Sequence, residues 1–444
     1  MIQDRAGATL ALAPTGRIEE PVAPHMKSST PALLPRLSLM MFLQYAIWGA
    51  WLPFLWSFLQ GYRHMQPAQI GNMFAAGAVG AIIGPFIAGQ VADRWFATEK
   101  FLALSHLAGA VLIWQLASVE SYSGFLVFSL VYGMVYAPTL ALTNSLAFHH
   151  LPDRDAQFGK VRLWGTFGWI VVGLAMGQWL AHAHATDVVA GKADAFRLSA
   201  ILGGLMGLYC WTLPNTPPTK GAKSNATFEA LSEIKRQPLI TLFLLAVPVS
   251  CIHQFYFVHT ESFLGAKQTS APAFFKTLFG EGGGGLMTIG QMSELLVLGA
   301  IPLVAKKLPR RTLLAIGLLA YALRMELFAN VDTLPMPVMV TLVLGIALHG
   351  LCFGCFIFVA FMVVDEETSG DVRASAQNLF NLVIIGIGVI VGSILAGRVA
   401  EWASPDGVMD YHKLFSVPMW TAMACLVALL LFYPRKKPAL AVAS

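Results

Sequence analysis

Charged residues are scarce in this 444-residue sequence: Asp, Glu, Lys and Arg make up only 12% of it, whereas 56% of the residues are hydrophobic. That balance excludes a soluble domain, and the chain is too long for a single pair of helices. The ten-residue alternation that would indicate a membrane β-barrel is also missing. The composition therefore predicts an all-α protein that crosses a membrane many times.

An apolar core is missing from the first 35 residues, which are polar and rich in Pro and Ala. A cleavable signal peptide needs such a core, so we interpret residues 1–35 as a disordered cytosolic tail. Cysteine is also rare, and the five cysteines fall in or beside apolar segments. Cys352 and Cys355 have the CxxC spacing, but inside a predicted span they indicate packing rather than a redox dithiol.

The net charge of +5 does not indicate a nucleic-acid partner, because the basic residues cluster in short connections between apolar segments. An even number of spans puts both termini on one side of the bilayer. A cytosolic N-terminus then places most of the 29 Lys and Arg residues in the cytosol. We therefore expect a multi-pass protein of the bacterial inner membrane with both termini cytosolic.

The apolar segments predict twelve transmembrane helices in two six-helix bundles. The bundles occupy residues 36–213 and 238–433, with a polar cytosolic linker at 214–237 and a cytosolic tail at 434–444. The spans are expected at residues 36–60, 68–92, 101–119, 124–148, 161–181, 198–213, 239–265, 286–305, 313–330, 335–364, 374–398 and 415–432.

A weak internal repeat supports this division, since Gly159–Gly165 returns as Gly370–Ala376 at an offset of 211 residues. Repeated six-span halves are the architecture of the major facilitator superfamily, which binds substrate between the halves. The Gly-x-x-x-Asp-Arg pattern that ends with Asp93 and Arg94 resembles the cytosolic signature of that superfamily. We predict a gating latch from these two residues and from Arg373; a solvated charged loop is the alternative.

A carboxylate lies inside the apolar run from Met287 to Leu303. Burying Glu294 there costs roughly 2.5–3.5 kcal/mol on insertion scales, so it is expected to face a cavity or a partner. Gln291 lies three residues earlier, on the same helical face. The pair indicates a polar binding site that can also carry a proton, and a structural hydrogen bond between helices is the alternative.

Five motifs together resemble the bacterial nucleoside:proton symporter family, and they extend over nearly all twelve spans. The resemblance implies a major facilitator fold and transport of purine and pyrimidine nucleosides with protons. The motifs are Phe42–Leu52 (FLQYAIWGAWL), Tyr136–Leu140 (YAPTL), Val161–Gly168 (VRLWGTFG), Gln291–Glu294 (QMSE) and Val372–Gln377 (VRASAQ).

The resemblance also implies a set of substrate-binding positions. This sequence agrees with the family at Arg162, Thr166, Gln254, Gln291, Glu294 and Phe353.

Four positions depart from the family pattern. Trp169 stands in place of a phenylalanine, Phe257 in place of an amide and His349 in place of a tyrosine. Gly354 stands where the family has an aspartate, which removes a carboxylate from the expected site.

A nucleoside presents a flat base, a hydrogen-bonding base edge and a ribose with vicinal hydroxyls. Aromatic rings stack on bases, and amides read base edges. Without the family, the same residues would suit a sugar about equally well, so a major facilitator carrier of a sugar or another small polar solute is an alternative. We assign stacking to Phe353 or Trp169, base contacts to Gln254 and Gln291, and ribose contacts to Glu294 and Thr166. Since His253 and Gln254 are adjacent, at most one of them is expected to line a cavity.

Glu294 is the predicted proton-coupling group, and Glu261 near the outer end of the seventh span is the second candidate. With Gly354 in place of a second carboxylate, Glu294 alone would bind ribose and proton in turn, so a facilitator without proton coupling stays open. For Arg324 we expect an architectural ion pair with another helix rather than a substrate contact.

Two alternatives lie outside transport. An intramembrane metalloenzyme would use His149 and His150 or His182 and His184, but these pairs lie at span ends without matching carboxylates. A membrane sensor stays open. We expect a monomeric transporter in the lipid bilayer, not an enzyme, that imports nucleosides by proton symport and alternating access and needs no metal or cofactor.

Overall fold

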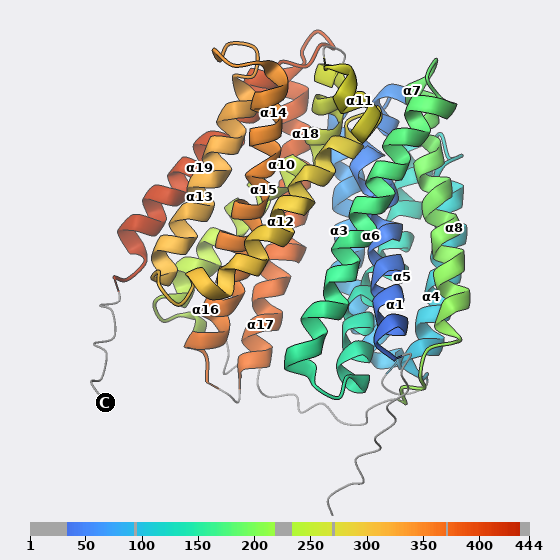
Figure 1. Cartoon of the computed structure of the whole chain (residues 1–444), viewed down its shortest axis with the longest axis vertical. Helices are drawn as coiled ribbons and strands as arrows, with labels where there is room; N and C mark the ends of the chain where they lie inside the picture. Colours follow the sequence, from blue (N-terminus) through green and yellow to red (C-terminus); the bar gives the residue numbers. More distant parts are fainter. Residues whose placement is uncertain (1–32, 93–95, 218–232, 269–270, 370–371, 436–444) are drawn as a thin grey trace, which may run out of the picture. The chain divides into compact units, whose positions relative to one another are not determined.

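Helices make up the regular structure of this protein in the residues that the computed structural model describes, which are 33–92, 96–217, 233–268, 271–369 and 372–435. Within those ranges there is no strand. The long helices run side by side along the vertical direction of Figure 1. The all-α class expected from the sequence is confirmed.

The helices before the linker are α1 (Leu33–Trp51), η1 (Leu52–Phe54), α2 (Leu55–Ser57), η2 (Phe58–Tyr62), α3 (Pro67–Ala92), α4 (Thr98–Leu116), α5 (Tyr122–His150), α6 (Arg154–Ala183), α7 (Val188–Gly191) and α8 (Ala193–Cys210). Those after it are α10 (Leu239–Lys267), α11 (Ala273–Phe279), α12 (Gly284–Val304), α13 (Arg310–Ala329), α14 (Val338–Ala347), α15 (His349–Leu351), η4 (Cys352–Phe358), α16 (Val359–Glu367), α17 (Arg373–Asn381), η5 (Leu382–Ile387), α18 (Gly388–Ala403) and α19 (Tyr411–Phe432).

Each of the twelve predicted spans coincides with one long helix or with a run of consecutive helices. The first is the run from α1 to η2, the tenth is the run from α14 to α16, and the eleventh is the run from α17 to α18. Among the described residues, nine of these segments are long and apolar enough to cross a membrane by length and composition. The boundaries of two six-helix bundles stay a prediction.

The helix starts follow from capping residues in the connections. Ser121 caps α5 by accepting a hydrogen bond from the backbone N–H of Gly124, and Asp153 caps α6 in the same way through Ala156. Asp410 caps the start of α19 in the same way. Short polar side chains at these positions accept the backbone N–H groups that the first helical turn leaves unpaired.

In the described part of the chain, three of the long helical runs contain a wider, π-helical turn: η2, η4 and η5. Such turns insert an extra residue into the hydrogen-bond ladder and are frequent at functional sites. The turn η4 contains Phe353 and Gly354, two positions that the family resemblance singles out.

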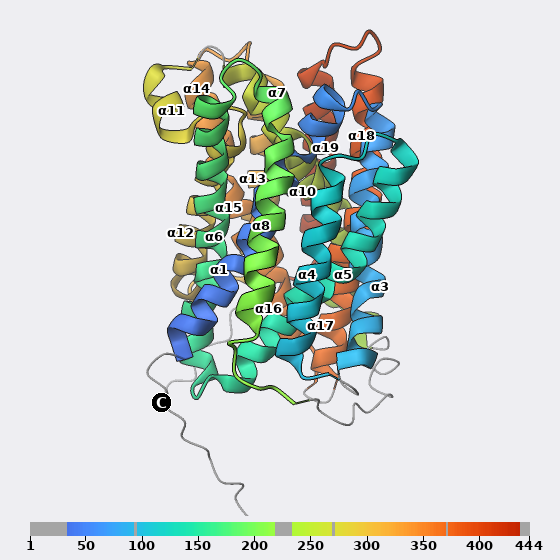
Figure 2. The ribbon, with the colours of Figure 1, turned by 90° about the vertical axis from the view of Figure 1, so that its right-hand side faces the viewer.

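Within the first half of the chain, α3 packs on α5 and α4 packs on α8, as Figure 2 also shows. Within the second half, α10 packs on α18 and α13 on α19. Contacts between the halves join α3 to α18 and α6 to α12. At the first of these, a Cβ on Gly71 would lie 2.7 Å from the Ser393 carbonyl oxygen, and one on Gly397 would lie 2.9 Å from the Gly71 Cα. Glycine therefore lets these two backbones approach closely.

Candidate functional site

His349 lies at the centre of a buried cluster to which α10, α12, α13 and α15 contribute. Gly290 on α12 allows this approach, because a Cβ there would lie 2.8 Å from the Tyr256 hydroxyl oxygen and 3.2 Å from the His349 Cβ. Gly350 on α15 allows it as well, since its Cβ would lie 2.5 Å from the Ser293 carbonyl oxygen. Small residues thus bring several helices together around one imidazole.

Two charged side chains contact the two ring nitrogens of His349. Glu294 Oε2 lies 3.4 Å from Nε2, and Arg324 Nη1 lies 3.0 Å from Nδ1. The histidine is 1% exposed, whereas the Glu294 side chain is 15% exposed. Arg324, His349 and Glu294 therefore form a line from α13 through α15 to α12, and the carboxylate is its accessible end.

Arg324 is fully buried, and its partners differ from the expected carboxylate on another helix. Its guanidinium carbon lies 4.4 Å from the ring centroid of Tyr256 and 5.1 Å from that of Tyr321. A desolvated cation–π contact stabilises by about 2 kcal/mol. The neighbouring Glu326 accepts a hydrogen bond from Asn330 at 2.7 Å. Two tyrosine rings and a histidine thus accommodate the charge.

Aromatic rings surround the same imidazole. Tyr256 stacks on His349 with ring centroids 4.6 Å apart, and His253 stacks on it at 5.4 Å. Phe257 meets His253 at 5.1 Å and Phe353 meets it at 6.3 Å. Because His253, Phe257 and Phe353 are partly exposed, their rings can offer a face to a flat ligand.

Several buried polar atoms of this cluster have no hydrogen-bond partner among the described residues. They are Gln291 Oε1, the Tyr256 hydroxyl and the Arg324 Nε and Nη2 atoms. A buried polar group without a partner costs about 1–3 kcal/mol. These atoms give the cluster a capacity for further hydrogen bonds, which is a property of a polar binding site.

The structure brings together Gln291, Glu294, His349 and the neighbouring Phe257 and Phe353, five of the predicted substrate-binding residues. Their helices are α10, α12, α15 and η4.

The Gln254 side chain points away from the cluster around His349. Its Nε2 donates to Ser393 Oγ on α18 at 3.0 Å, and its side chain is buried there. The adjacent His253 faces His349 instead. As expected, only one of these two neighbours reaches the cluster, but it is the histidine.

Helix α6 carries the three remaining predicted residues. Arg162 and Thr166 lie one helical turn apart and are partly exposed, with the Arg162 guanidinium 4.0 Å from the ring centroid of Tyr45. Trp169 is buried between Trp48 and Phe257, at centroid distances of 5.6 and 6.3 Å. It therefore joins α6 to the aromatic cluster.

Glu261, the second proton-coupling candidate, lies in a contact between the two halves of the chain. Its Oε1 is 3.0 Å from Lys192 Nζ, and Ser57 Oγ donates to its Oε2. The Glu261 side chain is fully buried and that of Lys192 is 8% exposed. This group is a buried ion pair with a hydroxyl donor, and the role of Glu261 in proton coupling stays a prediction.

Of the three predicted gating residues, Arg373 is among the described residues. Asp93 and Arg94 lie outside the described residues. Arg373 Nε lies 3.7 Å from Asp365 Oδ1, and both side chains are about half exposed. This pair is within the second half of the chain.

Gly354, which the resemblance implies stands in place of an aspartate, faces α12. A Cβ at this position would lie 2.6 Å from Val297 Cγ1. The valine therefore occupies the direction in which a side chain at position 354 would point.

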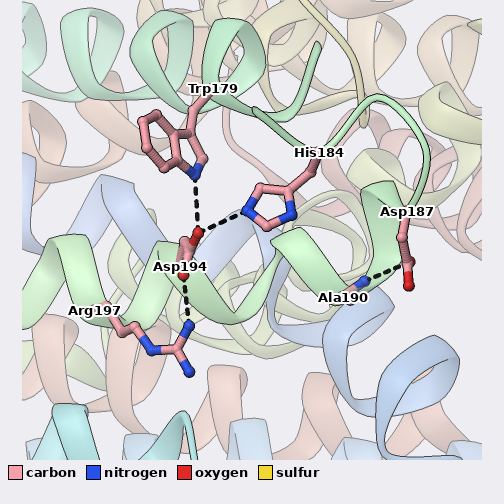
Figure 3. Close-up of polar contacts among 6 residues, drawn as sticks. All are labelled: Trp179, His184, Asp187, Ala190, Asp194 and Arg197. Atoms are coloured by element: carbon pink, nitrogen blue, oxygen red, sulfur yellow. Dashed lines mark hydrogen bonds and ion pairs between the residues drawn. The ribbon is translucent and has the colours of Figure 1, made fainter. Parts of the chain in front are cut away.

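The histidines proposed for a metalloenzyme have other partners. Figure 3 shows Asp194 accepting hydrogen bonds from Trp179 Nε1 at 2.9 Å and Arg197 Nη1 at 2.6 Å, with His184 Nε2 at 2.8 Å. His150 contacts the Thr216 hydroxyl at 2.9 Å. No group of three or more His, Cys, Asp or Glu suited to a metal occurs in the described part of the chain.

Tyr256 and Tyr321 are parts of the site that the sequence did not single out, and His253 was considered only as an alternative to Gln254. The available signal was Arg324: a guanidinium in mid-span needs partners there, and aromatic residues on neighbouring spans can supply them.

Residues 32–438 match the family described as Nucleoside H+ symporter. The chain belongs to this family. The xanthosine permease of Escherichia coli strain K12 is 30% identical over 410 residues, which cover 90% of this chain and 95% of that protein. Since the family consists of transporters, the prediction that the protein is not an enzyme is confirmed, and it is a multi-pass membrane transporter.

Solved structures show the same fold. A crystal structure of the nucleoside transporter NupG matches with a TM-score of 0.80 and 25% identity, covering 91% of this chain and 100% of that one. The crystal structure of a D-xylose-proton symporter matches in fold alone, with a TM-score of 0.67 and 15% identity over 90% of this chain and 98% of that one. The predicted major facilitator fold is therefore confirmed.

Proposed function

We propose that this protein imports nucleosides together with protons by alternating access. The observation that carries the proposal is the contact of Glu294 with His349 inside an aromatic cluster, in a chain of the nucleoside H+ symporter family. A carboxylate in mid-span that is accessible at one end can take up a proton and release it.

The cluster offers what an uncharged nucleoside needs. Phe257 and Phe353 are partly exposed and can stack on the base, a contact that contributes about 1–3 kcal/mol per base. The unpartnered Gln291 Oε1 can accept a hydrogen bond from a base N–H. Glu294 and Thr166 would bind the ribose hydroxyls from opposite halves of the chain. Trp169 is buried, so we assign it to support of Phe257 rather than to stacking on the base.

Alternating access is supported by the position of the polar contacts between the halves. Gln178 Nε2 donates to the Thr277 carbonyl oxygen at 2.8 Å, and the Glu281 N–H donates to that of Gly177 at 2.9 Å. These contacts and the Lys192–Glu261 ion pair lie in segments that the charge distribution assigns to the outer side. We propose that the described arrangement is closed toward the outside.

The test is uptake of labelled uridine into proteoliposomes with and without an imposed inward proton gradient. We expect the wild-type protein to accumulate uridine when the gradient is present and Glu294→Gln to equilibrate it without accumulation. Glu326→Gln is the matched control, because that carboxylate accepts a hydrogen bond from Asn330 and lies outside the cluster around His349. It should accumulate uridine like the wild type.

Each rival predicts a different result. Equilibration without accumulation by the wild type would indicate a facilitator. Competition by glucose, but not by adenosine, would indicate a sugar carrier. No uptake of any of these solutes would favour a sensor and would refute the proposal.

We also propose that the protein is a monomer in the bacterial inner membrane with both termini cytosolic. The support is the distribution of Lys and Arg along the sequence and the completeness of the cluster within one chain. Labelling of terminal tags in intact and in opened cells tests the orientation, and the mass of the detergent-solubilised protein tests the oligomeric state.

A further inference from the structure

The contacts of His349 permit only one arrangement of its ring protons. An arginine guanidinium can donate hydrogen bonds but cannot accept them. Because Arg324 Nη1 lies 3.0 Å from His349 Nδ1, that nitrogen must be the acceptor. The proton of the neutral imidazole is therefore on Nε2, the nitrogen that lies 3.4 Å from Glu294 Oε2.

The same contact keeps His349 neutral. A second proton would have to bind Nδ1, where it would meet the N–H of the fully buried Arg324. His349 is thus a fixed donor whose N–H nitrogen lies 3.4 Å from Glu294 Oε2. The carboxylate, at the accessible end of the line, is the member that can change its protonation state.

We propose, on the basis of the nucleoside:proton symport argued above, that the His349 Nε2–H is exchanged between Glu294 and the substrate. When Glu294 is ionised, its carboxylate accepts this N–H in a charge-assisted contact. A proton from the outer water then binds the carboxylate, which makes it a weaker acceptor. The freed N–H donates to an oxygen acceptor of the nucleoside, either a base carbonyl or a ribose oxygen.

Release reverses these steps. When the Glu294 proton passes to cytosolic water, the carboxylate recovers the Nε2–H and the substrate loses a donor. Proton and nucleoside therefore bind with positive cooperativity, and each must raise the affinity for the other by the same factor. Arg324 is a positioning residue in this scheme, because it acts only by fixing the tautomer of His349.

Among the described residues, the titratable and charged groups that surround Arg324, His349 and Glu294 include no second carboxylate. Helix α10 contributes His253 and Tyr256, and α13 contributes Tyr321, whose hydroxyl is hydrogen-bonded to His253 Nδ1 at 2.7 Å. Cys352 follows His349 in its own helical run, and Arg162 of α6 acts electrostatically on Glu294. These five groups are neutral or cationic.

One carboxylate is sufficient for coupling in this arrangement. Gly354 supplies no acid, and Val297 occupies the direction in which its Cβ would point. The exchange of a single N–H between two acceptors links proton and substrate binding without a second carboxylate.

The test is the pH dependence of uridine affinity in the full-length protein reconstituted in lipid nanodiscs. For one coupled proton, the Kd should rise by up to about tenfold per pH unit on the alkaline side. His349→Gln and His349→Asn are the matched pair. The glutamine amide nitrogen reaches the place of Nε2 and keeps the donor to Glu294, whereas the asparagine amide reaches only the place of Nδ1.

We expect His349→Gln to keep most of the pH dependence and His349→Asn to lose it, as Glu294→Gln should. Arg324→Lys retains a cationic donor and should preserve the slope, and Arg324→Met should reduce it to less than half. The slope of log Kd against pH is the decisive quantity, because a merely structural role would change affinity without changing the slope.

Equal slopes in the two His349 variants would overturn the proposal. If neither variant folds, the two Arg324 variants decide it, and equal slopes in that pair would overturn it as well. If Arg324→Met also fails to fold, the wild-type protein and Glu294→Gln decide. A wild-type protein that binds uridine with a Kd independent of pH would overturn the proposal. A roughly tenfold change of the wild-type Kd per pH unit that Glu294→Gln abolishes would support it. A wild-type protein that binds no nucleoside would instead refute the proposed function.

Discussion

Lys192→Met is predicted to open the contact between the two halves of the chain that we propose to lie on the outer side. In the wild type, Lys192 Nζ lies 3.0 Å from Glu261 Oε1, and the carboxylate is fully buried. The substitution leaves that carboxylate with Ser57 as its hydrogen-bond donor but without its counter-charge. Removing one partner of a buried ion pair costs about 3–5 kcal/mol.

This cost falls on the closed arrangement, because opening the outer side lets water reach Glu261. Since about 1.4 kcal/mol corresponds to a tenfold change in an equilibrium constant, a cost of about 3 kcal/mol shifts the equilibrium toward the open arrangement by roughly 100-fold. We therefore expect the protein to spend much more time open to the outside.

The assay is labelling with a membrane-impermeant maleimide in a Thr288→Cys background. Thr288 is 1% exposed and lies where α12 meets Gly173 of α6, so a cysteine there is labelled only after the halves separate on the outer side. The native cysteines are buried and serve as the unlabelled background. Lys192→Met should raise the labelling rate of Cys at position 288 by one to two orders of magnitude.

Two controls make the result interpretable. Lys413→Met removes an exposed pair with Asp410, in which the side chains are 47% and 40% exposed, and should leave labelling unchanged. The double variant Lys192→Met/Glu261→Gln removes both buried charges and should return labelling toward the wild-type rate. A single variant labelled no faster than the wild type, or a double variant labelled as fast as the single, would refute the reasoning.

Gly177→Ala should lower the free energy of unfolding by roughly 1–3 kcal/mol and reduce uptake, because the added Cβ would clash with the Phe279 carbonyl oxygen. Gly204→Ala meets no atom within 4 Å and should be neutral, so equal melting temperatures of the two variants would contradict the steric argument. Gly354→Asp should lower uridine uptake about tenfold because its Cβ meets Val297, a cost of about 1.4 kcal/mol. The added substitution Val297→Ala should restore most of that uptake, and failure to do so would show that the carboxylate itself is harmful.

Local sequence was sufficient for the pairing of Gln291 with Glu294. Residues three positions apart share a helical face wherever the helix is placed, and a carboxylate in an apolar run needs a polar environment. The long helices could also be predicted, because nine of the helical segments in the described part of the chain are continuous apolar stretches that are visible in the sequence.

The choice between His253 and Gln254 could not be made in this way. Both residues lie on α10 and point to different faces, so the outcome depends on which neighbouring helix lies on each side. Packing of α10 on α18 takes Gln254 to Ser393, and the contact with α15 takes His253 to His349. Neither contact is local in sequence.

The sequence by itself determined the all-α membrane class, the positions of the long helices and the resemblance to nucleoside:proton symporters. These features rest on composition, on periodicity and on motifs within single helices. Only the tertiary structure decided that Arg324 contacts His349, that His349 contacts Glu294 and that Lys192 is paired with Glu261. Each of these contacts joins residues on different helices. Which helix faces meet is a property of the packed molecule, because the glycines that permit close approach act only where another backbone arrives.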